Sequence, residues 1–98
     1  MAKLTTVYWR DIPAQVIAKE RRETAKIVLT ERFAEAIDKA AMRAKMAGTD
    51  AYLEQWRREV VNCGRDLQAV VDAAAATLEQ AYDDARLDLL VSNGGLEP

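Results

Sequence analysis

Histidine is absent from this sequence of 98 residues, and cysteine occurs only once, at Cys63. The lack of histidine removes the commonest general base and the commonest metal ligand found in proteins. A single cysteine excludes an internal disulfide and a zinc site built on cysteines. Glycine-rich phosphate loops and paired nucleophile–base motifs are missing as well. We therefore expect no metal, no cofactor and no catalytic residues, and we do not expect an enzyme.

Long hydrophobic runs are also missing. A membrane-spanning helix needs about 18 or more apolar residues in succession, and no segment approaches that length. The beginning of the chain, MAKLTTVYW, has neither the apolar core nor the small-residue cleavage site of a signal peptide. These absences favour a cytoplasmic protein without a membrane partner. The hydrophobic content of 50% and the charged content of 31% are typical of one globular domain covering residues 1–98.

Charge is unevenly distributed along the chain. Residues 1–65 hold 13 of the 14 Lys and Arg and nine of the 16 acids, whereas residues 66–98 hold Arg86 and seven acids. The net charge of −2 means that the chain has no overall positive charge to attract nucleic acid, so we do not expect a nucleic-acid partner. Either the two halves attract each other across the fold, or each presents a surface of one sign. We favour the first, because charge runs usually mark solvated faces.

The residues that are present predict an α+β fold. Residues 3–29 are rich in β-branched and aromatic residues and predict a three-stranded antiparallel meander. Pro13 places a turn near residues 11–13, and the charged residues 19–23 are typical of a hairpin tip. The first strand is expected at a sheet edge, open to pairing with another chain.

Three helices are expected after the strands, at about 31–46, 50–59 and 65–91. Thr30 and Thr49 are typical helix N-caps. In the second helix, Trp56 is expected on the same face as Tyr52, and residues 60–64 are expected to form a loop. The third helix carries a stripe of small apolar residues at helical spacing. Residues 92–98 are expected to form a flexible tail.

The stretch VYWRDIPAQ, residues 7–15, is either a structural corner or a functional site. If Trp9 faces inward it belongs to the core, and Tyr8 and Arg10 then form an exposed aromatic–cation pair. If Tyr8 faces inward, Arg10 must be buried and paired, with Asp11 as its nearest partner. We favour a corner. The residues expected on an interaction surface, should there be one, are Tyr8, Trp9, Arg10, Asp11, Trp56 and Arg57.

Three further groups of residues give weaker signals. Cys63 is more typical of a small buried apolar residue than of a nucleophile, because no histidine is available to activate it. Asp84 and Asp88 share a helix face, which is more typical of a solvated acidic surface than of a cation site. The cations among residues 19–22 are interleaved with Glu20 and followed by Glu23, so they do not form a phosphate-binding patch.

The segments VYWRDIPAQVI, ERFAEAIDKAAMRA, DAYLEQW, CGRDLQA and YDDARL resemble the bacterial virulence factor domain family. The resemblance covers nearly the whole chain. It implies a small cytosolic protein and, by association, an accessory subunit linked to folate- and corrinoid-dependent one-carbon metabolism. It supplies no catalytic or ligand-binding residue.

Two functions remain open. The first is a non-catalytic interaction module with a protein partner whose identity the sequence does not give, and a homodimer is also left open. The alternative is a small anion- or metabolite-binding protein anchored by Arg10 and the neighbouring aromatics, because a guanidinium group binds carboxylates and phosphates in a bidentate manner.

Overall fold

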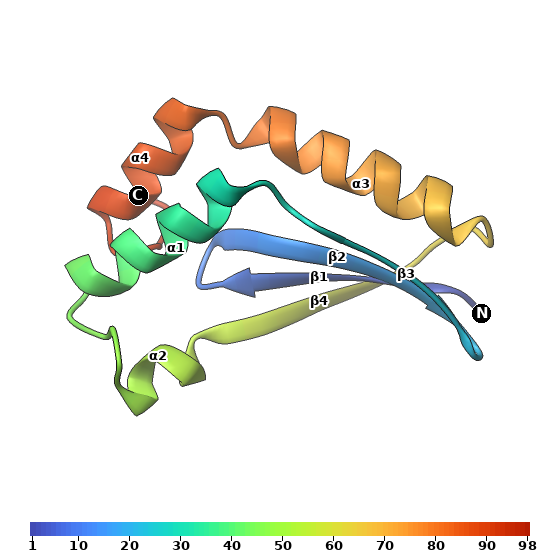
Figure 1. The fold of residues 1–98 in the computed structure, drawn as a ribbon, viewed down its shortest axis with the longest axis horizontal. Helices are drawn as coiled ribbons and strands as arrows, with labels where there is room; N and C mark the ends of the chain where they lie inside the picture. Colours follow the sequence, from blue (N-terminus) through green and yellow to red (C-terminus); the bar gives the residue numbers. More distant parts are fainter.

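The computed structural model describes residues 1–98 and contains four strands and four helices (Figure 1). In chain order these are β1 (Lys3–Trp9), β2 (Ile12–Glu20), β3 (Glu23–Val28), α1 (Glu31–Arg43), α2 (Asp50–Glu54), β4 (Trp56–Asn62), α3 (Leu67–Ala81) and α4 (Asp84–Ser92). The α+β class agrees with the prediction, but the chain has one strand and one helix more than the sequence indicated. None of the helices is long and apolar enough to cross a bilayer.

The strands form one antiparallel sheet in the order β3-β2-β1-β4. Arg10 and Asp11 connect β1 to β2, and the positive φ of 53° at Arg10 is typical of tight hairpin turns. The predicted meander of three strands is present. The prediction that the first strand lies at the edge is wrong, because β4 pairs with β1 along its whole length, from Lys3–Asn62 to Trp9–Trp56.

β4 occupies residues for which we expected the end of a helix and a loop. The helix begins as predicted, with the Thr49 hydroxyl accepting a hydrogen bond from the Tyr52 N–H, but it ends at Glu54. Residues 56–62 then form a strand whose side chains are all exposed. Because neither face of β4 is buried, its sequence, WRREVVN, shows no apolar alternation. Its conformation is set by pairing with β1 rather than by a local pattern.

The predicted helix over residues 65–91 is two helices. α3 ends at Ala81, Tyr82 is not helical, and the Asp83 carboxylate accepts a hydrogen bond from the Arg86 N–H to cap α4. The apolar spacing continues through the break, which is why periodicity alone does not reveal it. Asp83 is a typical N-cap residue and Asp84 a typical residue of a first helical turn.

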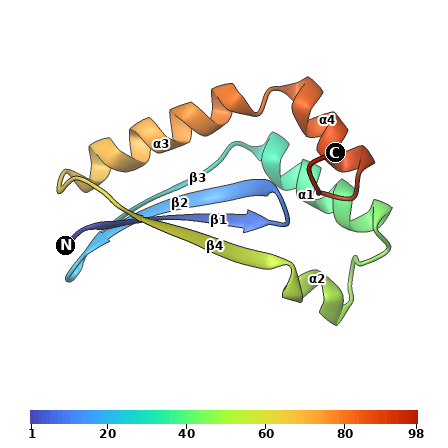
Figure 2. The same cartoon turned by 180° about the vertical axis from the view of Figure 1, so that it is seen from behind.

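The core lies between the sheet and the helices. α3 packs on β2 and β3, and α1 packs on β2 and α4. Both views show α3 running beside β3 and β2, with β4 on the far side of the sheet (Figure 1, Figure 2). The largest fully buried side chains are those of Trp9, Phe33, Ile12, Leu90, Val16, Val71 and Pro13. Burying a large apolar side chain contributes about 1.5–3 kcal/mol, so these residues supply much of the stability.

The end of the chain folds back onto the β1–β2 turn, whereas the sequence suggested a flexible tail. The Gly95 N–H donates to the Leu90 carbonyl at 2.7 Å, and the Gly95 carbonyl accepts from the Asp11 N–H at 2.8 Å. The Glu97 N–H donates to the Asp11 carboxylate at 2.7 Å. Gly94 and Gly95 are buried and have positive φ, which glycine adopts without strain. The first hairpin and the end of α4 are therefore tied together.

Candidate functional site

The residues predicted for an interaction surface come from two distant segments of the chain. They meet at one end of the sheet. The register of β4 pairs Tyr8 with Arg57 and Trp9 with Trp56. Arg10 and Asp11 form the adjoining turn. The sequence grouped these residues by type alone, and the β1–β4 pairing brings them into contact.

Trp9 belongs to the core. Its indole is fully buried and stacks on Tyr52, with ring centroids 5.6 Å apart. The indole Nε1–H donates to the Tyr52 carbonyl at 2.9 Å. Trp56 packs edge-on against the same Tyr52 ring. Trp9 therefore faces inward, which was one of the two alternatives, and it holds α2 against the sheet.

Arg10 is a structural residue of the corner. Its Nε donates to the Gln55 side chain at 3.2 Å, one terminal nitrogen to the Gly94 carbonyl at 2.9 Å and the other to the Met46 sulfur at 3.2 Å. The guanidinium carbon lies 5.4 Å from the centre of the Trp9 ring, so Arg10 does not pair with Tyr8. Each guanidinium nitrogen thus has one partner within the protein, which fixes the orientation of the group and leaves a second N–H on each terminal nitrogen.

Tyr8 pairs with a different cation, Arg57, whose guanidinium carbon lies 4.4 Å from the ring centre. Arg57 also pairs with Asp11 at 3.2 Å and with Glu59. Burial raises the pKa of Tyr8, and Tyr82 and Glu59 add to that effect. Burial would lower the pKa of Arg57, but the hydrogen bonds and charges of Glu59 and Asp11 outweigh it and raise that pKa. The phenol stays neutral and the guanidinium charged at neutral pH.

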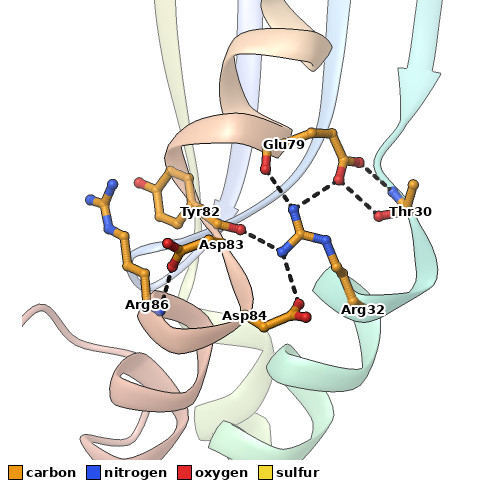
Figure 3. A network of polar contacts seen from close by, with 7 residues as sticks. All are labelled: Thr30, Arg32, Glu79, Tyr82, Asp83, Asp84 and Arg86. Carbon is orange, nitrogen blue, oxygen red and sulfur yellow. Dashed lines mark hydrogen bonds and ion pairs between the residues drawn. The ribbon is translucent and has the colours of Figure 1, made fainter.

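A second polar network joins α1 to the end of α3 (Figure 3). The Arg32 guanidinium donates to the carbonyls of Glu79 and Tyr82, which the last turn of α3 leaves without helical partners. It also pairs with the Glu79 carboxylate at 3.0 Å and with Asp84 at 3.3 Å. The Glu79 carboxylate accepts from the Thr30 N–H and hydroxyl, both at 2.9 Å. Thr30 thus occupies the predicted N-cap position, and its hydroxyl donates to Glu79 rather than capping α1.

The weaker sequence signals stay apart in the structure. Cys63 is half-buried against the hydrophobic core. Asp84 is engaged by Arg32, and no group of three or more His, Cys, Asp or Glu residues gathers in metal-binding distance. The charged tip between β2 and β3 is an exposed turn.

The side of the sheet opposite the helical core forms a separate surface, which we call the open face. Strand alternation and the register assign its members. They are Lys3, Thr5 and Val7 of β1; Gln15, Ile17 and Lys19 of β2; Thr24, Lys26 and Val28 of β3; and Arg58, Val60 and Asn62 of β4. The neighbouring residues of β2, Val16 and Ala18, are fully buried on the other side.

The open face is basic, with an aliphatic centre. It carries Lys3, Lys19, Lys26 and Arg58 and no carboxylate, and none of these cations forms an ion pair. Val28 is 65% exposed and Val60 is 56% exposed. Trp56 lies at one end, where Val7, Gln15 and Arg58 help to line a hollow of about 520 Å³. Asp38 of α1 lines a neighbouring hollow with Val28 and Trp56.

Residues 7–91 match the sequence profile of a family described as Virulence factor. The chain belongs to the virulence-factor family. The match begins within β1 and ends one residue before the end of α4, so it includes all of the helices and strands between them. No curated protein and no solved structure matches the chain.

The virulence-factor resemblance is most specific in the opening segment and in the segment that forms α1. Residues 7–15 of the opening segment form the β1–β2 turn and its flanks. Trp9, Ile12 and Pro13 are buried, and Arg10 and Asp11 bind α2 and the end of the chain. In this member of the virulence-factor family the segment is therefore a structural corner, as we favoured.

Sequence reasoning missed the open face. The alternation of Lys26 with Ala25 and Ile27 was a usable signal, because it places Lys26 on the exposed side of β3. Arg58 and Val60 gave no such signal, because β4 was not recognised as a strand. Lys19 was interpreted as part of the hairpin tip, and Lys3 was not singled out.

Proposed function

We propose that this protein is a small non-catalytic interaction module, or accessory subunit, of the cytoplasm, and that it binds a protein partner through the open face. One observation carries the proposal: four cations without a carboxylate surround the exposed Val28 and Val60 on the sheet face opposite α3. Unpaired charges of one sign beside exposed apolar side chains suit a partner surface that is acidic and aliphatic.

The open face suits a protein better than a nucleic acid. Sheet surfaces that bind single-stranded nucleic acid stack bases on aromatic rings. Here the positions between the cations are occupied by Thr5, Val7 and Ile17, and Trp56 lies at one end, packed against Tyr52. The link to folate- and corrinoid-dependent metabolism is supported by the family resemblance alone.

Affinity purification from the native cell tests the proposal. The variant Lys19→Glu/Lys26→Glu reverses two cations of the open face. The control Lys39→Glu/Arg43→Glu makes the same change of charge on exposed positions of α1. We expect the wild type and the control to retain a stoichiometric partner that the open-face variant loses. Equal recovery by both variants, or a monomer without any partner, would contradict the proposal.

A further inference from the structure

β4 is an edge strand whose residues are all exposed. It pairs only with β1, and Trp56 at its beginning packs against Tyr52 of α2. Val60 on the open face is 56% exposed and Val61 on the opposite face is 57% exposed. Uncovered edge strands are the usual templates for adding a strand from another chain.

The register shows which backbone groups of β4 are free. The Cys63 N–H donates to the Ala2 carbonyl, and the Gln55 carbonyl accepts from the Arg10 N–H, both at 3.1 Å. Hydrogen-bonded residues alternate along an antiparallel pair, so the odd-numbered residues between them bond to β1. The N–H and C=O groups of Arg58 and Val60 therefore point away from β1, toward the free edge. Their side chains lie on the open face.

A strand added antiparallel to β4 would place one residue opposite Arg58 and, two positions earlier in its own sequence, one opposite Val60. Residues directly opposite each other share a face of the sheet and lie in side-chain contact. Arg58 has no ion-pair partner, whereas Arg57 already holds Asp11 and Glu59. A carboxylate is therefore the best match opposite Arg58, and aliphatic side chains are the best match opposite Val60 and Val61.

We propose that β4 is extended by an antiparallel strand of the protein partner, which places a carboxylate opposite Arg58 and an aliphatic side chain opposite Val60. This rests on the proposed function and specifies the partner's chemistry. Read along the partner, the motif is two aliphatic residues, any residue, then an acid.

A second copy of this chain fits β4 less well. Its free backbone groups also belong to even-numbered residues, so a β4–β4 pair must match even with even. Glu59, the acid of this strand, then never lies opposite Arg58. Arg58 would face Trp56, Arg58, Val60 or Asn62 instead, so no register supplies it with a carboxylate, and directly opposed like charges are destabilising.

Amide hydrogen exchange followed by NMR tests the strand addition. The probe is a synthetic peptide with the length of β4, 7 residues, carrying two valines, a threonine and a glutamate in the proposed order. The control peptide has lysine in place of glutamate. In the free protein we expect fast exchange at Arg58 and Val60. Saturating acidic peptide should slow both amides by about tenfold or more, because they become hydrogen-bonded.

The other sheet edge provides an internal control. The Leu29 N–H donates to the Ala14 carbonyl, so by the same alternation the Lys26 N–H points to the free edge of β3. Its exchange should stay fast with either peptide. Peptide binding without slower exchange at Arg58 and Val60, or equal slowing at Lys26, overturns the proposal.

Two variants complete the test. Val60→Pro removes an outward N–H without breaking a bond to β1 and should abolish the slowing at Arg58. Arg58→Glu should reverse the preference so that the lysine peptide binds better. Slow exchange without peptide, together with a dimeric mass, would mean that a second copy occupies β4 and would overturn the proposal.

The affinity purification separates this inference from the proposed function. A partner that is lost with Lys19→Glu/Lys26→Glu but kept with Val60→Pro and Arg58→Glu would leave the interaction module standing and refute strand addition. A partner lost with all three supports both.

Discussion

At the scale of single residues, Arg32 does the most to join the helices. Its guanidinium supplies donors to two carbonyls at the end of α3 and pairs with Glu79 and Asp84 (Figure 3). We predict that Arg32→Ala lowers the free energy of unfolding by about 1–3 kcal/mol, chiefly because those carbonyls lose their donor. The side chain is 29% exposed, so the ion pairs themselves contribute less.

Urea unfolding measures the effect of Arg32→Ala. The matched control is Lys39→Ala, which removes an exposed cation of α1 that has no ion pair and should change stability by no more than about 0.5 kcal/mol. Equal effects of the two substitutions would show that the network stabilises nothing.

Glu79 makes the same junction sensitive to acid. Burial would raise its pKa, but hydrogen bonds from Thr30 and Arg32 outweigh burial and hold it below the ordinary value of 4.5. A carboxyl with a lowered pKa in the folded state stabilises the fold above its unfolded pKa, and this contribution is lost as pH falls through the folded pKa. The stability difference between wild type and Glu79→Gln should therefore shrink from neutral pH to about pH 3 in urea titrations. A stability difference that stays constant with pH would rule out this contribution of the Glu79 carboxylate.

At the scale of elements, the turn after α4 locks the hairpin corner. A Cβ on Gly95 would lie 2.7 Å from Cζ3 of Trp9, and the glycine has a φ of +92°. Gly48, after α1, has a similar φ of +75° but open space around it. We expect Gly48→Ala to cost about 1 kcal/mol and Gly95→Ala clearly more, because only Gly95→Ala also forces Trp9 to move. Thermal unfolding would measure the loss of stability, and tryptophan fluorescence would report the movement of Trp9. Equal losses of stability in the two variants would contradict the close contact.

The elements that the sequence predicts correctly are those with a local signal. The hairpin strands show apolar alternation at Ala25 and Ile27, and α1 shows Phe33, Ile37 and Ala40 at helical spacing. β4 has no local signal, because its strand conformation depends on pairing with a segment about fifty residues away in the chain. The candidate residues lie near one another in the structure, but their burial depends on the same pairing and could not be predicted.

At the scale of the whole molecule, the two halves attract each other, as we favoured, and the basic half also presents a surface of one sign. Arg32 of the basic segment binds Glu79 and Asp84 of the acidic segment, so the two halves attract each other inside the fold. The cations of the open face have no such partner within the chain. The first set of charges stabilises the fold, and the second is left available for the interaction that we propose.

All of the tyrosines belong to the end of the molecule that carries the β1–β2 turn, α2 and α4 (Figure 1). Burial is the largest cause of a raised pKa at Tyr8, Tyr52 and Tyr82. A raised pKa in the folded state contributes stability that is complete below the unfolded value of 10.0 and is lost as pH rises through the folded value. We therefore predict that the phenolate absorbance of the native protein has its titration midpoint above pH 10, and that the free energy of unfolding falls as pH rises through that range. In urea, the same titration should centre near 10. Native phenols that titrate at 10 without unfolding would show that this end of the molecule is open to water.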